Sequence, residues 1–212
     1  MLKEEVIWFK RELKKIPASK LSVTLNLGSG NKFLRSTKQP WIQKYLFTPL
    51  EQRKVKVVHL DVCSDDGVDI VLDIEKERIA KISGLKSVFA NNILEHVVSP
   101  KKVAKKIEDI VPTGGYIFVS VPYKYPYHPS PIDNMFRPDP SELASLFPGF
   151  KIVAQNIVYG GTLTDALSKE KTFKIPSIKY WRSILSHLAF LNCNFAVSCL
   201  VLWKVDQSAP PV

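Results

Sequence analysis

A short apolar run that leads directly into Gly-Ser-Gly restricts the fold of this chain more than any other feature. Residues 23–27 read Val-Thr-Leu-Asn-Leu, and Gly28, Ser29 and Gly30 follow at once. Apolar and β-branched residues favour a strand, and glycines let the next residues turn tightly and bring the backbone close to a ligand. The pattern is typical of the first strand of an α/β domain with a nucleotide-like ligand at its end, although an ordinary tight turn uses the same residues.

Further strand-like runs alternate with helical or turn segments along the chain. Residues 100–111 place Val103, Ile107 and Ile110 on one face with lysines opposite, which indicates an amphipathic helix. This alternation predicts a Rossmann-like three-layer α/β/α sandwich with a mostly parallel seven-stranded sheet and an insertion before the last strand. The predicted strands are residues 22–27, 56–60, 70–72, 87–91, 115–121, 150–158 and 195–205.

The length of 212 residues suits one well-packed domain. Residues 1–20 are predicted to form an N-terminal amphipathic helix that ends near Pro17, and residues 21–206 the single domain. Within it, residues 161–191 separate the last two strands by too many positions for a hairpin, so we expect an insertion that caps the sheet or binds a partner. Residues 207–212 are expected to be a frayed tail.

The chain has a formal net charge of +10, which favours anionic partners such as nucleic acid, phosphorylated sugars or an acidic membrane surface. The same lysines would also suit solvated helix faces. The cysteines, Cys63, Cys193 and Cys199, have neither metal-type nor redox-type spacing, and no His/Cys/Asp group has the spacing of a zinc site. We therefore expect a cytoplasmic protein without a metal.

Residues 184–203 contain no Asp, Glu, Lys or Arg, and their number matches a bilayer-spanning helix. The polar turn Asn192-Cys193-Asn194 interrupts the stretch, which favours a helix over residues 181–191 followed by a buried strand. A membrane span, contact with a membrane surface and a homodimer interface near residues 185–191 stay open as alternatives.

In a parallel sheet the ligand lies at the carboxyl ends of the strands. Asp61 follows the second predicted strand, where a carboxylate accepts hydrogen bonds from a ribose diol, and Asp73 follows the third, where it can accept one from an exocyclic amine. Asn91 and Asn92 follow the fourth strand, and Tyr123 follows the fifth. Each aspartate could instead cap a helix, Asp73 one that starts near residue 75.

The residues at these strand ends resemble those of the class I S-adenosylmethionine-dependent methyltransferases over roughly residues 21–158. The motifs that carry the resemblance are Leu25-Asn26-Leu27-Gly28-Ser29-Gly30, the acid Asp61, Val71-Leu72-Asp73 and Ile93-Leu94-Glu95-His96-Val97. A further run, from His128-Pro129-Ser130-Pro131-Ile132-Asp133 to Phe150, is similar to the methyltransferase type 11-like subgroup found among glycan and cell-surface saccharide enzymes.

This resemblance implies S-adenosylmethionine as the cofactor, with the glycine turn at its amino-acid part, Asp61 at the ribose and Asp73 at the adenine. The distance of 31 positions from Gly30 to Asp61 exceeds the roughly 20 of a dinucleotide site, which disfavours a nicotinamide cofactor. The predicted cofactor-binding residues are Asn26, Gly28, Ser29, Gly30, Asp61, Asp73, Asn91 and Asn92.

Transfer of a methyl group to a hydroxyl benefits from a base, and histidine titrates in the right range. We favour His128, because Asp133 in the same loop could orient its ring, and we keep His96 as the second candidate. Arg137 is expected to hold a phosphate or carboxylate of the substrate, with Tyr123 beside it. Alternatively, residues 123–128 form a packed loop, and Glu95 and His96 an exposed pair, with no chemical role.

The leading hypothesis is therefore a methyltransferase that acts on a small-molecule or saccharide acceptor, through a hydroxyl oxygen. Residues 91–94 read Asn-Asn-Ile-Leu and not the Asn/Asp-Pro-Pro-Tyr/Phe turn that amino methylation of bases usually employs, which disfavours nucleic acid as acceptor. Two alternatives remain: a non-catalytic S-adenosylmethionine-fold binding protein, and a basic RNA-directed methyltransferase.

Overall fold

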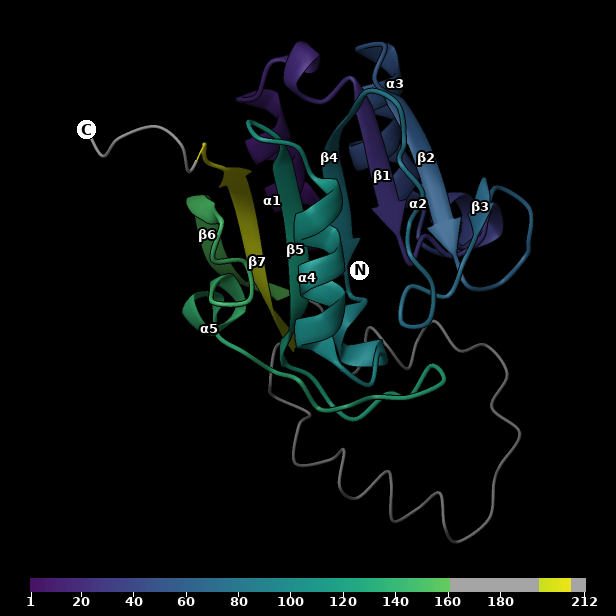
Figure 1. Cartoon of the computed structure of the whole chain (residues 1–212). Coiled ribbons are helices and arrows are strands. Elements are labelled where there is room, and N and C mark those ends of the chain that lie inside the picture. Colours follow the sequence, from purple (N-terminus) through teal and green to yellow (C-terminus); the bar gives the residue numbers. More distant parts are fainter. Residues whose placement is uncertain (161–194, 207–212) are drawn as a thin grey trace, which may run out of the picture.

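A computed structural model of the chain describes residues 1–160 and 195–206. Seven strands form one sheet in the order β3-β2-β1-β4-β5-β7-β6 (Figure 1). The first five strands pair in parallel, and β7 runs antiparallel to both β5 and β6. The strands are β1 (Val23–Leu27), β2 (Lys56–Asp61), β3 (Ile70–Val71), β4 (Leu85–Asn91), β5 (Tyr116–Lys124), β6 (Phe150–Gly160) and β7 (Phe195–Lys204).

Helices cover both faces of this sheet, which gives three layers. In Figure 1, α4 lies in front of the sheet and α1 behind it. The α-helices are α1 (Lys3–Lys14), α2 (Pro40–Ile42), α3 (Thr48–Gln52), α4 (Pro100–Ile110) and α5 (Pro140–Ala144). The shorter turns are the 3-10 helices η1 (Ala18–Lys20) and η4 (Leu94–His96) and the π-helical turns η2 (Leu34–Lys38) and η3 (Gln43–Phe47).

The alternation of side chains along β4 separates two hydrophobic cores, because successive residues of a strand point to opposite faces. Val88 packs in the core beneath α4 and α5, whereas Phe89 packs in the core beneath α1, α2 and α3. The ring of Phe89 stacks on that of Phe118 with 4.6 Å between centroids, and the ring of Phe9 from α1 packs edge-on against both. Both cores therefore pack against β4, one on each face of the sheet.

The predicted fold class, a mostly parallel seven-stranded sheet in a Rossmann-like sandwich, is confirmed. The N-terminal helix is shorter than the predicted residues 1–20, because α1 ends at Lys14 and a separate 3-10 turn follows Pro17. The predicted insertion at residues 161–191 and the predicted tail at residues 207–212 lie outside the described residues.

The helix predicted to start near Glu75 is wrong. Asp73 caps a single turn, in which the backbone N–H of Glu75 donates to Oδ1 of Asp73 over 2.9 Å. The turn does not continue into a helix, and Nζ of Lys106, on α4, donates to the carbonyl oxygens of Ile74, Glu75 and Glu77.

In the part of the chain that the structure describes, no helix has the length and apolar character to cross a membrane. Residues 195–203 of the uncharged stretch 184–203 belong to strand β7, so that stretch is not one continuous helix. The predicted strand within it is confirmed, while the predicted helix at residues 181–191 lies outside the described residues.

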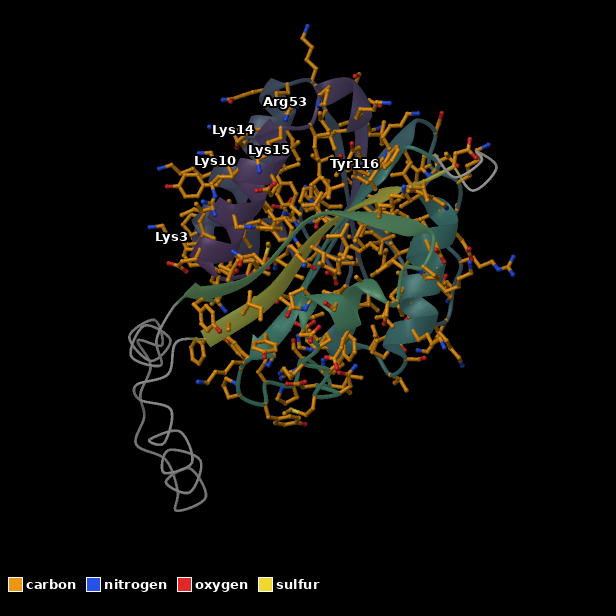
Figure 2. All side chains as sticks on the ribbon, turned by 90° about the vertical axis from the view of Figure 1, so that its left-hand side faces the viewer. Lys3, Lys10, Lys14, Lys15, Arg53 and Tyr116 are labelled. Atoms are coloured by element: carbon orange, nitrogen blue, oxygen red, sulfur yellow. The ribbon has the colours of Figure 1, made fainter. Side chains whose placement is uncertain are left out.

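Basic side chains lie along the outer side of α1 (Figure 2). Nζ of Lys10 lies 4.7 Å from the ring centroid of Tyr45, and a guanidinium N–H of Arg53 donates to the carbonyl oxygen of Leu13 over 3.0 Å. These two cations thus contribute to packing as well as to charge. The labelled basic residues on this side are Lys3, Lys10, Lys14, Lys15 and Arg53.

Candidate functional site

The turn after β1 needs glycine at two positions. Gly28 and Gly30 have φ angles of +62° and +58°, in the left-handed region that other residues rarely adopt. A Cβ atom on Gly28 would lie 3.1 Å from Cδ1 of Ile93, and one on Gly30 would clash with Cδ2 of Leu34. The turn is therefore closely packed against the segments that follow β1 and β4, and is more than a surface bend.

A buried arginine fixes this turn. Nη1 of Arg35 donates to the carbonyl oxygens of Ser29 and Gly30 over 3.1 and 2.6 Å, and Nη2 donates to that of Gly67 over 2.7 Å. Only 4% of Arg35 is exposed, and burial lowers the pKa of its guanidinium against the raising effect of nearby aspartates. Because these hydrogen bonds hold the backbone of the turn, we describe Arg35 as a positioning residue.

Asp61, at the end of β2, reaches the same turn. Its Oδ2 accepts a hydrogen bond of 2.7 Å from the backbone N–H of Gly30, and its Oδ1 accepts one of 3.1 Å from that of Cys63. The 31 positions between Gly30 and Asp61 are taken up by the helical turns η2 to α3. The long spacing thus reflects extra helical residues in the crossover and leaves the ends of β1 and β2 adjacent.

A pocket with a volume of about 130 Å³ lies at the ends of β1 and β4. Five predicted cofactor residues line it, and five further residues that we did not predict complete the wall. The predicted ones are Asn26, Gly28, Ser29, Asn91 and Asn92, and the others are Met1, Leu34, Gln39, Ile42 and Phe47. Gly30, Asp61 and Asp73 do not line this pocket, although Gly30 and Asp61 form the turn beside it.

The first residue of the chain enters the pocket. The terminal ammonium of Met1 donates to Oε1 of Gln39 over 3.0 Å, and Nε1 of Trp41 donates to the carbonyl oxygen of Met1 over 3.2 Å. Its thioether sulfur accepts a weak hydrogen bond of 3.9 Å from Nδ2 of Asn91. A thioether therefore lies against the asparagine that we expected beside the sulfonium of the cofactor.

Asn92 adopts a φ of +51°, which asparagine tolerates better than most residues. Its backbone N–H donates to the carbonyl oxygen of Ser120, and its Nδ2 donates to Oε1 of Glu5 over 2.9 Å. The same oxygen of Glu5 accepts a 2.6 Å hydrogen bond from Oγ of Ser120. Glu5 is fully buried, so α1 inserts a carboxylate between Asn92, which follows β4, and Ser120, within β5.

Asp73 lies away from the pocket. Its Oδ2 forms an ion pair of 2.9 Å with Nζ of Lys76, and its backbone caps the turn described above. The hydrogen bond from Lys76, ahead of the smaller opposing effect of burial, lowers the pKa of the carboxyl. In this structure Asp73 acts as a turn cap.

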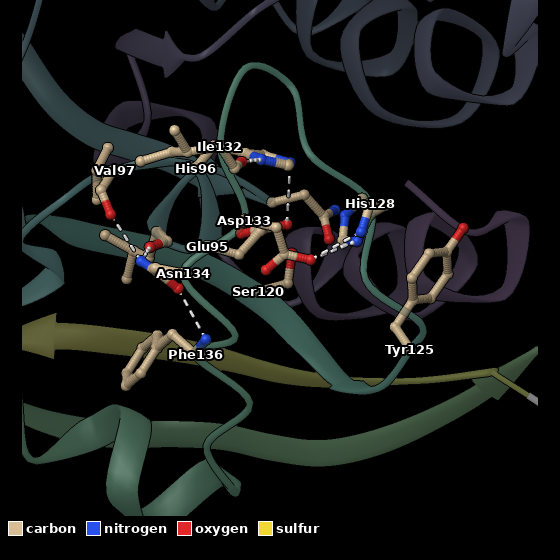
Figure 3. Close-up of polar contacts among 12 residues, drawn as sticks. Glu95, His96, Val97, Ser120, Tyr125, His128, Ile132, Asp133, Asn134 and Phe136 are labelled. Carbon is tan, nitrogen blue, oxygen red and sulfur yellow. Dashed lines mark hydrogen bonds and ion pairs between the residues drawn. The ribbon is translucent and has the colours of Figure 1, made fainter. Parts of the chain in front are cut away.

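The loop after β5 brings His128 and Asp133 together (Figure 3), and Arg137 pairs with the same aspartate. Oδ2 of Asp133 lies 3.1 Å from Nδ1 of His128 and also accepts the backbone N–H of His128 over 2.9 Å. The guanidinium of Arg137 donates two hydrogen bonds, of 3.0 and 2.6 Å, to the same carboxylate. Burial acts to raise the pKa of Asp133, but these hydrogen bonds hold it well below its usual range.

Arg137 and Tyr123 are the two residues that we predicted to bind the substrate. The guanidinium of Arg137 pairs with Asp133, and only 12% of the Arg137 side chain is exposed. In the described residues it therefore serves to position the loop. Tyr123, near the end of β5, is 37% exposed.

Asn134 ties this loop to the turn after β4. Its backbone N–H donates to the carbonyl oxygen of Glu95 over 2.9 Å, and its Nδ2 donates to those of Leu94 and Val97 over 2.8 and 2.7 Å. His96 joins the two segments as well, since its Nδ1 lies 2.7 Å from the carbonyl oxygen of Ile132. Two loops that are distant in sequence are thus held as one unit.

Glu95, His96 and His128 converge at this junction (Figure 3), with one potential ligand atom of each within 4.8 Å of the others. Glu95 is fully buried, and within the described residues neither of its carboxylate oxygens has a hydrogen-bond partner. Burial raises its pKa to about 8, with a further contribution from the charge of Glu5. Burial also lowers the pKa of His128.

Comparison with known protein families and with curated proteins finds no match for this sequence. Solved structures do match the fold. A protein from Galdieria sulphuraria, described as a candidate sarcosine dimethylglycine methyltransferase, has a TM-score of 0.59 and 9% identity over 94% of this chain and 84% of that one. Coclaurine N-methyltransferase bound to N-methylheliamine and S-adenosylhomocysteine has a TM-score of 0.57 and 14% identity over 92% and 70%.

The [4+2]-cyclase SpnF is similar to the same degree, with a TM-score of 0.57 and 12% identity over 92% of this chain and 81% of that one. The chain thus has the Rossmann-like fold of the class I methyltransferases, as the order of its strands indicates. A cyclase among the similar structures means that the reaction must be argued from the site itself.

Proposed function

We propose that the protein is an S-adenosylmethionine-dependent methyltransferase that acts on a small-molecule or saccharide acceptor, through a hydroxyl oxygen. The observation that carries the proposal is the left-handed turn at Gly28 and Gly30, closed by Asp61 at one side and open to a pocket at the other. Both glycines have positive φ angles, and Gly28 lines the pocket, so the turn can bring its backbone close to a ligand.

The residues present fit this cofactor. The backbone at Ser29 and the side chains of Asn26 and Asn91 would hold its amino-acid end, and Asp61 would accept hydrogen bonds from its ribose hydroxyls. Asp73 would meet the adenine only by exchanging its contact with Lys76. When bound, the cofactor would supply an electrophilic methyl group.

The acceptor, in this proposal, lies toward the junction of Glu95, His96 and His128. Nδ1 of His128 faces the carbonyl oxygen of Pro126 and Oδ2 of Asp133, which can only accept hydrogen bonds, so its proton sits at Nδ1. This leaves the lone pair of Nε2 for the hydroxyl of the acceptor. Asp133 thus gives His128 the tautomer that a general base requires.

The similar structures support the coarser part of this proposal. One is described as an N-methyltransferase bound to N-methylheliamine and S-adenosylhomocysteine, so that protein methylates a nitrogen. The preference for oxygen and for saccharides rests on the loop at residues 128–150 and its resemblance to saccharide-modifying enzymes.

Calorimetric titration of the purified chain with S-adenosylmethionine and S-adenosylhomocysteine tests the cofactor. We expect binding of one equivalent of each, and the absence of both would overturn the proposal. Transfer of a radiolabelled methyl group to a panel of hydroxylated small molecules and saccharides, with amines as the comparison set, then tests the acceptor. Labelling of the amines alone would exclude the hydroxyl.

One observation favours a second function, that of a non-catalytic binding protein with the same fold, which transfers no methyl group. Met1 places its own thioether against Asn91 inside the pocket. A protein of this kind would show S-adenosylhomocysteine binding but no transfer to any acceptor class. The same titrations therefore separate the two functions.

A further inference from the structure

We infer that Glu95, His96 and His128 form a binding site for a divalent transition-metal ion of the zinc class. Two imidazoles and one carboxylate are a common ligand set for such ions. One potential ligand atom of each residue lies within 4.8 Å of the other two. Ligands on a tetrahedral zinc ion lie about 3.3 Å apart, so a contraction of at most about 1.5 Å between ligand atoms would complete the site.

The carboxylate is the first argument for a cation. Both oxygens of Glu95 are buried and, among the described residues, unpartnered, and Oε1 lies 3.8 Å from Nε2 of His96. Burial of an unpaired carboxylate is costly, and native proteins usually pair such a group or place it on a metal. Arg137 does not meet this need, because its guanidinium is paired with Asp133.

The orientation of both imidazoles is the second argument. Nδ1 of His96 lies 2.7 Å from the carbonyl oxygen of Ile132, and Nδ1 of His128 lies 3.0 Å from that of Pro126. Because a carbonyl only accepts, each ring carries its proton at Nδ1 and presents a lone pair at Nε2. The rings lie 5.1 Å apart between centroids at an angle of 80°, so they approach from different directions.

The surroundings of His128 are the third argument. Histidine ligands of metals commonly donate their other N–H to a carboxylate, which fixes the ring and raises its basicity. Asp133 has this relation to His128, at 3.1 Å, and Arg137 fixes Asp133 in turn. Asn134 holds the loop that carries His128 to the turn that carries Glu95 and His96.

This inference goes beyond methyl transfer and does not depend on it. Three protein ligands leave at least one coordination position for another molecule, as in catalytic zinc sites. The lone pair of Nε2 on His128 cannot bind an ion and accept a proton at once. With an ion bound, His128 is a ligand, and the ion itself lowers the pKa of a hydroxyl that binds beside it.

The experiment measures metal binding without any methyl donor. The full chain, without a histidine tag, is freed of metal with a chelator and titrated with Zn²⁺ against a chromophoric competitor. We expect one tight equivalent. Glu95→Gln, His96→Ala and His128→Ala should each weaken binding at least 100-fold, and Asp133→Asn about 10-fold, because the last removes only the partner of a ligand. His59→Asn is the matched control and should bind as the wild type does.

Titration with Co²⁺ gives an independent readout, since its visible absorption reports the ligands. We expect tetrahedral or five-coordinate bands without thiolate charge transfer, unchanged by Cys63→Ser. Glu95→Gln keeps the shape of the side chain, and a melting curve confirms that each variant is folded. Failure of wild-type protein to bind one equivalent, or undiminished binding in folded Glu95→Gln and His128→Ala, would overturn the site. Titration of the same metal-free protein with S-adenosylhomocysteine tests the proposed function. Failure of the metal site and failure of the proposed function can therefore be told apart.

Discussion

The backbone N–H of Gly30 donates a hydrogen bond of 2.7 Å to Oδ2 of Asp61, and this contact joins the end of β1 to the end of β2. The bond closes one side of the glycine turn with a carboxylate. The turn and the acid are therefore one unit, and loss of the acid should affect the turn as well as any ligand that the acid contacts directly.

Replacement of Asp61 by Ala should weaken binding of S-adenosylhomocysteine by about 10-fold to 100-fold, because hydrogen bonds to a charged group contribute about 1.5 to 3 kcal/mol. Calorimetric titration measures the change. Asp65→Ala is the matched control, since Asp65 lies in the same region but its carboxylate is exposed and contacts Asn31. Equal affinities for the two variants would remove Asp61 from the ligand site.

Gly30→Ala and Gly114→Ala form a matched pair, because both glycines have positive φ angles, +58° and +77°. A Cβ on Gly114 meets open space, whereas one on Gly30 would clash with Leu34, a residue that lines the pocket. We expect Gly114→Ala to lower the free energy of unfolding by about 1 kcal/mol and Gly30→Ala by about 2 to 3 kcal/mol. Urea unfolding measures both values.

The same pair should differ in ligand binding. Displacement of Leu34 by the new methyl group narrows the pocket in Gly30→Ala, so the affinity for S-adenosylhomocysteine should fall in this variant and stay at the wild-type value in Gly114→Ala. Similar affinities in the two variants would show that the turn is only a bend in the chain.

The positions of the strands and the residues at their ends could be predicted because they depend on local patterns. A β-branched run followed by glycine, aspartate or asparagine marks the end of a strand wherever it occurs. The polar residues at Asn26, Ser29 and Asn91 were found in this way, and each lines the pocket.

The remaining parts of the site depend on contacts between residues that are far apart in sequence. Glu5 bonds to Ser120 across 115 positions, and Asn134 reaches Leu94 across 40. His96 and His128 have no metal-like spacing in the sequence and meet only because Asn134 and Ile132 tie their loops together. No local pattern marks Arg35 or Gln39 either, since both lie in the helical crossover between β1 and β2.

Glu5 should be the most important residue of α1 for stability. Its carboxylate accepts a buried hydrogen bond from Ser120 and partly buried ones from Asn92 and the backbone of Leu2. Glu5→Ala leaves these donors unpaired, so the free energy of unfolding should fall by about 3 kcal/mol. Glu4→Ala, an adjacent and exposed position, should change it by less than about 0.5 kcal/mol. Chemical denaturation of both variants measures the difference, and a small effect at Glu5 would contradict the role of this carboxylate.

His59 should make the stability of the protein depend on pH below neutrality. Burial of its ring, together with the charge of Arg35, lowers its pKa from 6.5 to about 4, although Asp69 acts in the opposite direction. Between these pH values the unfolded chain binds a proton at His59 and the folded chain does not. The free energy of unfolding should therefore fall as the pH drops from about 6.5 to about 4. With allowance for the partial exposure of the ring, the loss should be about 2 kcal/mol.

The variant His59→Asn isolates this effect. Asparagine places an oxygen near the position of Nδ1, which lies 3.1 Å from Nδ2 of Asn26, and it does not titrate. Urea denaturation of both proteins at several pH values should show that the free energy of unfolding of the wild type falls by about 2 kcal/mol relative to that of His59→Asn between pH 7 and pH 4, since only the wild type must exclude a proton from this site when it folds. A constant difference across this range would show that His59 titrates in the folded protein as it does in the unfolded chain.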